Sequence, residues 1–235
     1  IVKHFFPISS AGLYPLIAGL LFGFPLGSKI AAELVLSQKM TYEEGSHLFC
    51  ICNNISPVFI SGFIITDCLH CPKLLLPSYC ILYLPPLVLY MFLYHKKDFS
   101  ASAILQKKTA SMNFQLIDAG IMNGFETLAK LGGYIMLFAI LAQMSTLLPI
   151  SNQYLQCICV GFTEITNGIA YTTHTKMPFA KMYPLVMAYT AFGGLSGIAQ
   201  TTSMVKDVRF PIKPYIFTKL FGTGITFLLA HLLIQ

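Results

Sequence analysis

The chain has 235 residues, of which 55% are hydrophobic and only 10% are charged, and its mean hydropathy is +0.69. Soluble domains carry about 25% charged residues, so this composition excludes a water-soluble globular protein. The formal net charge of +6 comes from Lys, with Arg209 as the only Arg, whereas phosphate and base recognition usually recruits Arg, so nucleic acid is not an expected partner. The seven Cys form no soluble framework and are expected to be mostly free thiols.

Three continuous apolar segments are predicted to cross a bilayer as helices, namely 77–94, 131–148 and 215–234. At about 1.5 Å per residue, such helices reach the roughly 30 Å thickness of a hydrocarbon core. The predicted fold class is therefore an all-α polytopic membrane protein.

Four further apolar segments have polar or helix-breaking residues near their centres. These segments are 11–38, 46–66, 153–182 and 183–205. An unpaired backbone group in lipid costs several kcal/mol, so broken backbone survives only where protein or a water-filled cavity covers it. Re-entrant hairpins and discontinuous helices around a midplane site meet this condition. The alternative is that these segments are ordinary kinked helices that pack through small residues.

The order of the segments repeats along the chain. Gly161 follows Gly23 by 138 positions, as residue 215 follows residue 77. Each unit is read as a re-entrant hairpin, a broken helix and a spanning helix. The units and the segment between them are a first repeat at 1–95, a cytoplasmic linker with an interfacial helix at 96–130, and a second repeat at 131–235. The second unit begins with helix 131–148, so an upstream helix is expected in the full protein unless the fold departs from this symmetry.

Positive charge orients the two units, because cytoplasmic loops are enriched in Lys and Arg. Two clusters mark cytoplasmic connections: Lys96, Lys97, Lys107 and Lys108 in the linker, and Lys206, Arg209 and Lys213 after the last broken helix. The two hairpins then enter the membrane from opposite faces, which makes the repeat inverted. Lys176 and Lys181 fall on the outer side and count mildly against this topology.

Five motifs, in order along nearly the whole chain, carry a family resemblance. They are Gly23–Lys29, Cys52–Phe59, Phe125–Tyr134, Glu164–Gly168, and Phe192–Ser196 with Gln200. With these motifs the chain resembles the sporulation integral membrane protein YlbJ family, which belongs with proteins bearing the nucleoside-recognition Gate domain. It departs from the usual pattern at Ile55-Ser56, where a Ser-Gly or Thr-Gly pair is more common. The resemblance implies a role in spore formation in a Firmicute-type bacterium and leaves the substrate open.

The same resemblance suggests binding residues. In concentrative nucleoside carriers, motifs similar to those of the second hairpin and the last broken helix line the binding site. By that likeness the candidate solute- or ion-binding residues of the second unit are Thr163, Glu164, Asn167 and Ser196. Their counterparts in the first unit are Asn53, Asn54 and Ser56.

Glu164 is the strongest individual candidate, because a carboxylate among apolar residues costs about 2.5–3.5 kcal/mol on insertion scales. It can accept a hydrogen bond from a hydroxyl group, bind a cation or exchange a proton. Alternatively, it caps the N-terminus of a half-helix in the hairpin. Asn53 and Asn54 offer donors and acceptors either to a ligand or to the unwound backbone itself.

Other polar groups favour structural interpretations. Lys29 with Glu33, and Glu126 with Lys130, are spaced to pair on one helix face. Three neighbouring potential ligands, Cys68, His70 and Cys71, are fewer than the four that a zinc site normally requires, so no metal site is expected. No P-loop, G-x-S-x-G or H-E-x-x-H motif occurs, and we expect neither enzymatic activity, nor catalytic residues, nor a cofactor.

The sequence thus predicts a multi-pass protein of the bacterial cell membrane, including the membranes of a sporulating cell, that moves a small polar solute or ion. Its expected partners are the lipid bilayer and that solute, and a homo-oligomer is compatible with the sequence. The alternative is a non-transporting scaffold that recruits spore envelope or coat proteins through the Lys-rich linker and the interfacial helix.

Overall fold

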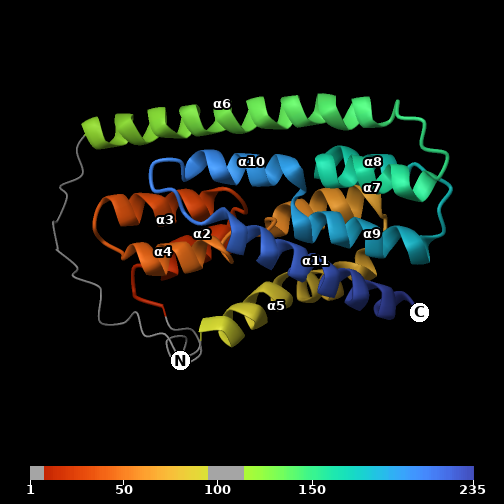
Figure 1. Cartoon of the computed structure of the whole chain (residues 1–235), viewed down its shortest axis with the longest axis horizontal. Helices are drawn as coiled ribbons and strands as arrows, with labels where there is room; N and C mark the ends of the chain where they lie inside the picture. The colour runs from red at the N-terminus through yellow and green to blue at the C-terminus, as the bar shows by residue number, and fades with distance from the viewer. Residues whose placement is uncertain (1–7, 95–113) are drawn as a thin grey trace.

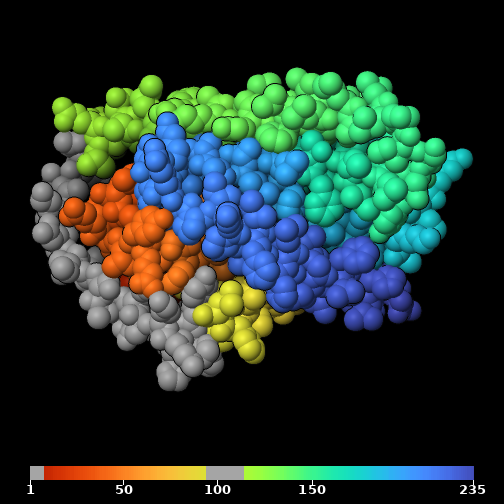
Figure 2. Space-filling model, in the orientation of Figure 1, coloured from red at the N-terminus to blue at the C-terminus, as the bar shows by residue number. Residues whose placement is uncertain are grey.

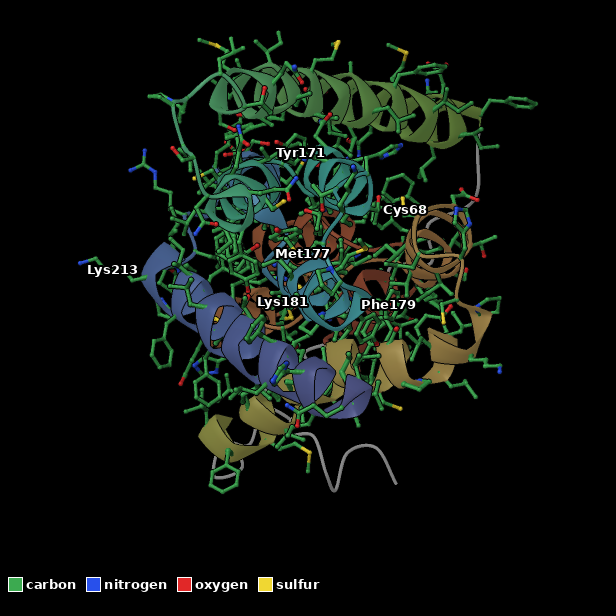
Figure 3. All side chains as sticks on the ribbon, turned by 90° about the vertical axis from the view of Figure 1, so that its right-hand side faces the viewer. Cys68, Tyr171, Met177, Phe179, Lys181 and Lys213 are labelled. Atoms are coloured by element: carbon green, nitrogen blue, oxygen red, sulfur yellow. The ribbon has the colours of Figure 1, made fainter. Side chains whose placement is uncertain are left out.

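The computed structural model describes residues 8–94 and 114–235, and the regular elements in these ranges are helices, with no strand among them. Most of the helices run roughly along the longest axis of the molecule (Figure 1). Helix α6 lies along one side, and α5 and α11 lie along the opposite side. The view at right angles shows the same arrangement (Figure 3).

The first half of the chain contains a helical hairpin, a broken helix and a long helix. Their bounds are α2 (Leu13–Leu21) and α3 (Leu26–Leu36) for the hairpin, α4 (Tyr42–Phe49) and the π-helix η1 (Phe59–Cys68) for the broken helix, and η2 (Pro72–Leu74) with α5 (Leu75–Tyr94) for the long helix. The broken helix starts earlier than the predicted 46–66, because Thr41 caps it by accepting a hydrogen bond from the Glu44 N–H.

A continuous helix, α6 (Phe114–Ser145), follows in the described chain. The prediction of a separate interfacial helix that ends at residue 130 and a spanning helix over 131–148 is wrong in this respect. The Gly132-Gly133 pair does not end the helix, because a glycine costs only about 1 kcal/mol inside a helix and strong helix formers precede it. Residues 95–113, which include Lys96, Lys97, Lys107 and Lys108, lie outside the described residues.

The second half again contains a hairpin, a broken helix and a long helix. Their bounds are α7 (Gln153–Thr163) and α8 (Ile165–Thr173), α9 (Phe179–Phe192) and α10 (Gly194–Met204), and α11 (Ile212–Ile234). The hairpin ends at Thr173 rather than at the predicted residue 182, because Pro178 occupies the N-cap of α9 and lets the next helix begin at Phe179. The two hairpins lie at opposite ends of the molecule (Figure 1).

Three helices in the described part of the chain are long and apolar enough to cross a membrane. They are α5 together with η2, α6 and α11. Helix α6 buries little of its surface and lies exposed along one edge of the space-filling view (Figure 2). Length and composition therefore agree with a membrane protein.

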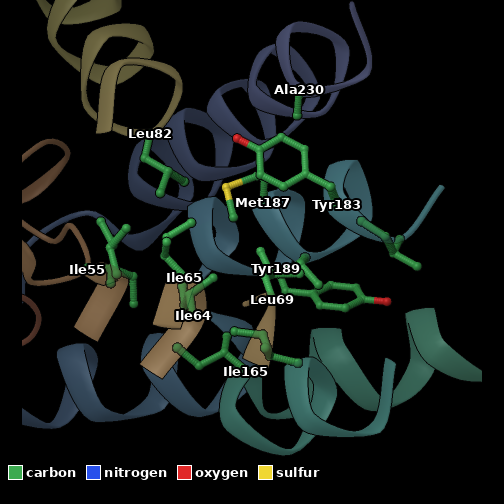
Figure 4. Packing of buried hydrophobic residues seen from close by; sticks show 14 of the residues in the cluster. Ile55, Ile64, Ile65, Leu69, Leu82, Ile165, Tyr183, Met187, Tyr189 and Ala230 are labelled. Atoms are coloured by element: carbon green, nitrogen blue, oxygen red, sulfur yellow. The ribbon is translucent and has the colours of Figure 1, made fainter. Parts of the chain in front are cut away.

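A buried apolar cluster joins η1, α5, α9 and α11 (Figure 4). Met187 and Tyr189 of α9 are fully buried in it, close to the end of that helix. A hydrogen bond of 2.9 Å between the hydroxyl groups of Ser78 and Tyr183 ties α5 to α9. The core thereby fixes α9 along its length, so that the break at its end has a defined position.

Paired glycines bring the two helices of each hairpin together. A methyl group at Gly27 would lie 2.9 Å from the Gly19 Cα, and one at Gly168 would lie 2.1 Å from the Gly161 Cα. Each hairpin also packs closely on its broken helix, because methyl groups at Gly19 and Gly161 would collide with the Cys52 carbonyl and the Tyr189 ring respectively. Each hairpin is therefore a compact unit.

Candidate functional site

The tips of the two hairpins meet at the break between α9 and α10. The ring of Phe24, at the tip of the first hairpin, lies against Gly193 and Gly197, and a methyl group at Gly193 would be 3.5 Å from the Phe24 Cε1. Gly194 faces the second tip, where a methyl group would lie 3.3 Å from the Thr163 carbonyl oxygen. Both hairpin tips therefore contact this break.

Glycine residues explain the backbone conformation at the first tip and at the break after α9. Gly23 and Gly193 adopt φ angles of +82° and +85°, in the left-handed region that glycine tolerates best. The first tip is fixed to the other broken helix by a hydrogen bond of 2.8 Å from the Phe24 N–H to the Asn54 carbonyl. The chain interruption after α4 therefore supports the tip of the first hairpin directly.

A cavity of about 200 Å³ lies where these segments meet. Residues of both hairpin tips and both broken helices line it, among them Gly23, Ser56, Glu164, Gly193, Ser196 and Gln200. Leu131 and Ile135 of α6 cover one side. Four polar interruptions that are far apart in the sequence thus border one space.

Glu164 is the polar residue of the second tip. It is only 2% exposed and separates α7 from α8. Its Oε2 accepts hydrogen bonds from the N–H and from the side-chain Nδ2 of Asn167, each at 2.8 Å. The other carboxylate oxygen, Oε1, has no hydrogen-bond partner among the described residues. The side chain is therefore a helix cap through one oxygen, and the residue also lines the cavity.

Two more side chains contribute polar atoms to the cavity. The Gln200 Nε2 donates a hydrogen bond of 2.8 Å to the Ser196 Oγ, and both residues are buried. From the other broken helix, the Ser56 Oγ accepts a hydrogen bond of 3.3 Å from the Phe59 N–H. Among the described residues that line the cavity, Glu164 is the only one with a charged side chain.

Three predicted site residues point to structural partners instead. The Asn53 side chain accepts from the Ser28 Oγ at 2.6 Å and donates to the Phe49 carbonyl at 2.7 Å. The Asn54 Nδ2 donates to the Ile51 carbonyl at 2.8 Å. The Thr163 hydroxyl donates back to the carbonyl four residues earlier in its own helix. Their side chains bond to groups around the breaks, and none of the three lines the cavity. Asn167 does not line it either, because its amide bonds to Glu164.

The structure also places the charged pairs. Lys29 binds α6 through the side-chain oxygens of Asn123 and Thr127, and its Nζ lies 3.9 Å from a Glu33 carboxylate oxygen. Lys130 forms an ion pair of 2.6 Å with Glu126 within α6. The first pair fastens α6 to the hairpin, whereas the second is exposed.

No group of three or more His, Cys, Asp or Glu residues in 8–94 and 114–235 is arranged to hold a metal ion. The His70 Nδ1 instead lies 2.8 Å from the Thr66 carbonyl oxygen.

A wider groove of about 550 Å³ lies at the end of the molecule seen in Figure 3. Lys176, Met177 and Lys181 line it together with His231 of α11. It carries a positive charge that the cavity at the hairpin tips lacks. The two spaces share no lining residue and differ in the ligands they would attract.

Sequence reasoning missed two residues. Gln200 was recognised only as part of a motif, although its spacing of four from Ser196 places both on one helix face. Lys219 is absent from the predicted site, yet it is buried at 9% exposure on α11. The available signal was a lone lysine inside a segment predicted to span the membrane, where an ionisable residue is by default a functional candidate.

Comparison with known proteins adds no relative, since no family model, curated protein or solved structure matches the chain significantly.

Proposed function

We propose that this protein is a multispanning membrane transporter that binds a small polar solute or cation in the cavity at the hairpin tips. The observation that carries the proposal is the convergence of both tips and both broken helices on one cavity containing Glu164. Discontinuous helices that gather polar groups near the centre of a bundle are typical of secondary transporters.

The charge and size of the cavity narrow the class of solute. Glu164 contributes the charge, and no Lys or Arg among the described residues lines the space, so an anion would meet an unfavourable field. A volume of about 200 Å³ is below the roughly 300–1,000 Å³ of pockets for drug-sized ligands. The site therefore suits a metal cation, a small amine or a compact solute rich in hydroxyl groups.

The two hairpins are the parts that move in the proposed transport cycle. Phe24 lines the cavity from the first hairpin, and Glu164 lines it from the second. In our proposal, each hairpin moves as a compact unit on its own side, so that the cavity opens alternately to the two faces of the bilayer. The inverted repeat predicted from the charge clusters is the topology that this movement requires.

A role in spore formation is also part of the proposal and rests on the resemblance to the YlbJ family alone. The scaffold alternative depends on the linker lysines, which lie outside the described residues. The binding experiment below discriminates between the two, because a scaffold has no need for solute binding at Glu164.

The experiment compares wild-type protein with Glu164→Gln in equilibrium binding of metal cations, nucleosides and small anions. The Gln side-chain oxygen still accepts the Asn167 N–H, so the cap and the thermal midpoint should be nearly unchanged. Loss of the carboxylate should weaken binding of a cation or hydroxyl-bearing solute by about tenfold or more, as expected for a charge-assisted contact of 1.5–3 kcal/mol.

Glu33→Gln is the matched control, because its exposed carboxylate lies outside the cavity. The proposal fails if wild-type protein binds none of the ligands, or if Glu164→Gln binds them as tightly as wild type does.

A further inference from the structure

Lys219 is a buried ammonium whose contacts are main-chain carbonyls. The residue lies on α11, which packs against α9 and α5. Its Nζ donates hydrogen bonds to the carbonyl oxygens of Asn53 and, at 3.4 Å, of Ala191. The neighbouring Thr218 hydroxyl donates to the Cys50 carbonyl at 3.2 Å, which places the same face of α11 on the first break.

One of these carbonyls belongs to the end of a half-helix, and the other lies a few residues beyond one. Asn53 lies in the irregular stretch that follows α4, and Ala191 is in the last turn of α9. The last carbonyls of a helix lack intrahelical partners, and the helix dipole makes that end negative. Lys219 therefore lies at the negative end of α9 and against the irregular backbone that follows α4.

No carboxylate neutralises this ammonium within the described chain, where the ion pairs are Lys29–Glu33 and Glu126–Lys130. A cation held by neutral carbonyl dipoles is the arrangement by which membrane proteins bind Na⁺ and K⁺. A cavity of about 20 Å³ beside Lys219, lined also by Thr190 and Thr218, has room for one water molecule. The surroundings thus offer oxygen ligands of the kind a monovalent metal ion needs.

We propose that the Lys219 ammonium is a tethered cation in a monovalent-cation site formed by the Asn53 and Ala191 carbonyls, and that Na⁺ or K⁺ occupies this site when the side chain is shortened. The tethered charge joins the two broken helices without a bound ion. This inference does not depend on transport, because it concerns what holds the two breaks together.

The test measures thermal unfolding of purified protein in detergent at constant ionic strength, with Na⁺ or K⁺ replacing choline. The chain has no Trp, so a thiol-reactive fluorogenic dye reports the exposure of the buried Cys50, Cys52 and Cys157. Lys219→Ala opens space for an ion beside the carbonyls. Lys219→Met is the matched control, because it removes the charge but fills the space with an apolar chain of similar length.

Lys219→Ala should unfold at a lower temperature than wild type in choline and recover by roughly 4–8 °C as Na⁺ or K⁺ rises from about 1 to 300 mM. Wild type and Lys219→Met should not respond to the choice of cation. Equal cation responses in the three proteins would overturn the proposal. So would a Lys219→Ala protein that fails to fold equally in Na⁺, K⁺ and choline, since a site for the free ion would have rescued it.

Discussion

The ring of Phe24 lies so close to Gly197 that a methyl group there would be 2.9 Å from its Cε2 atom. This contact joins the tip of the first hairpin to α10 at the border of the cavity. We expect Gly197→Ala to displace the ring, because overpacking of this kind costs about 1–3 kcal/mol. Solute affinity should fall at least as much as stability, measured by equilibrium binding and by thermal unfolding.

Gly224→Ala on α11 is the control for that substitution, because nothing lies within 4 Å of a methyl group at this position. The double variant Phe24→Leu with Gly197→Ala should recover part of the lost affinity. No recovery would show that the ring is not what the new methyl group displaces.

A second glycine contact predicts loss of the fold rather than of binding alone. A methyl group at Gly168 would lie 2.1 Å from the Cα of Gly161, and a backbone atom cannot move aside as a side chain can. We expect Gly168→Ala to destabilise the protein by more than about 3 kcal/mol, at the severe end of single substitutions. Gly133→Ala on α6 meets nothing within 4 Å and should be neutral or stabilising by up to about 1 kcal/mol. Thermal unfolding of the two variants side by side checks both, and equal midpoints would contradict the close packing of the hairpin.

Substitution of Asn53 should lower stability and leave solute affinity nearly unchanged, the reverse of the result expected for Glu164→Gln. Asn53→Ala leaves the Phe49 carbonyl and the Ser28 hydroxyl without this partner, which should cost about 1–3 kcal/mol of stability. Solute affinity should change by less than about threefold, because Asn53 does not line the cavity. A threefold change corresponds to about 0.6 kcal/mol of binding free energy. A large loss of affinity with unchanged thermal stability would restore Asn53 to the binding site.

Lys29 of α3 should contribute more to the stability of the protein than the exposed Lys130 of α6 does. Its side chain is 17% exposed and binds Asn123 and Thr127, whereas the Lys130 side chain is 41% exposed. A double-mutant cycle between Lys29→Met and Thr127→Val should give a coupling energy of about 1–2 kcal/mol. The cycle between Glu126 and Lys130 should give at most about 0.5 kcal/mol, as exposed helix pairs do. Equal couplings would show that Lys29 does not hold α6 to the hairpin.

The positions of the helix breaks could be predicted from the sequence, whereas the directions of the side chains at the breaks could not. Glycine, proline and capping residues act locally, so Gly23, Gly193 and Glu164 mark breaks that need no tertiary information. In unwound backbone, side chains do not point in directions that repeat along the sequence. The sequence therefore could not show that Ser56 lines the cavity while Asn53 bonds to neighbouring structural groups. The partners of Lys219 are main-chain carbonyls, and these cannot be recognised from residue type.

Helix α6 shows a different limit. The apolar run predicted to span the membrane starts at residue 131, but the helix continues from Phe114 to Ser145. A change from polar to apolar composition marks where a helix could enter the bilayer and not where its backbone begins. The extra length could be recognised only from the continuous backbone.

Both hairpin tips contact the same short run of glycines, Phe24 at Gly193 and Gly197 and Thr163 at Gly194. In the proposed transport cycle, one tip could therefore move away while the other stayed against this segment. The proposal then requires that a continuous water path across the bilayer forms only when both tips have moved.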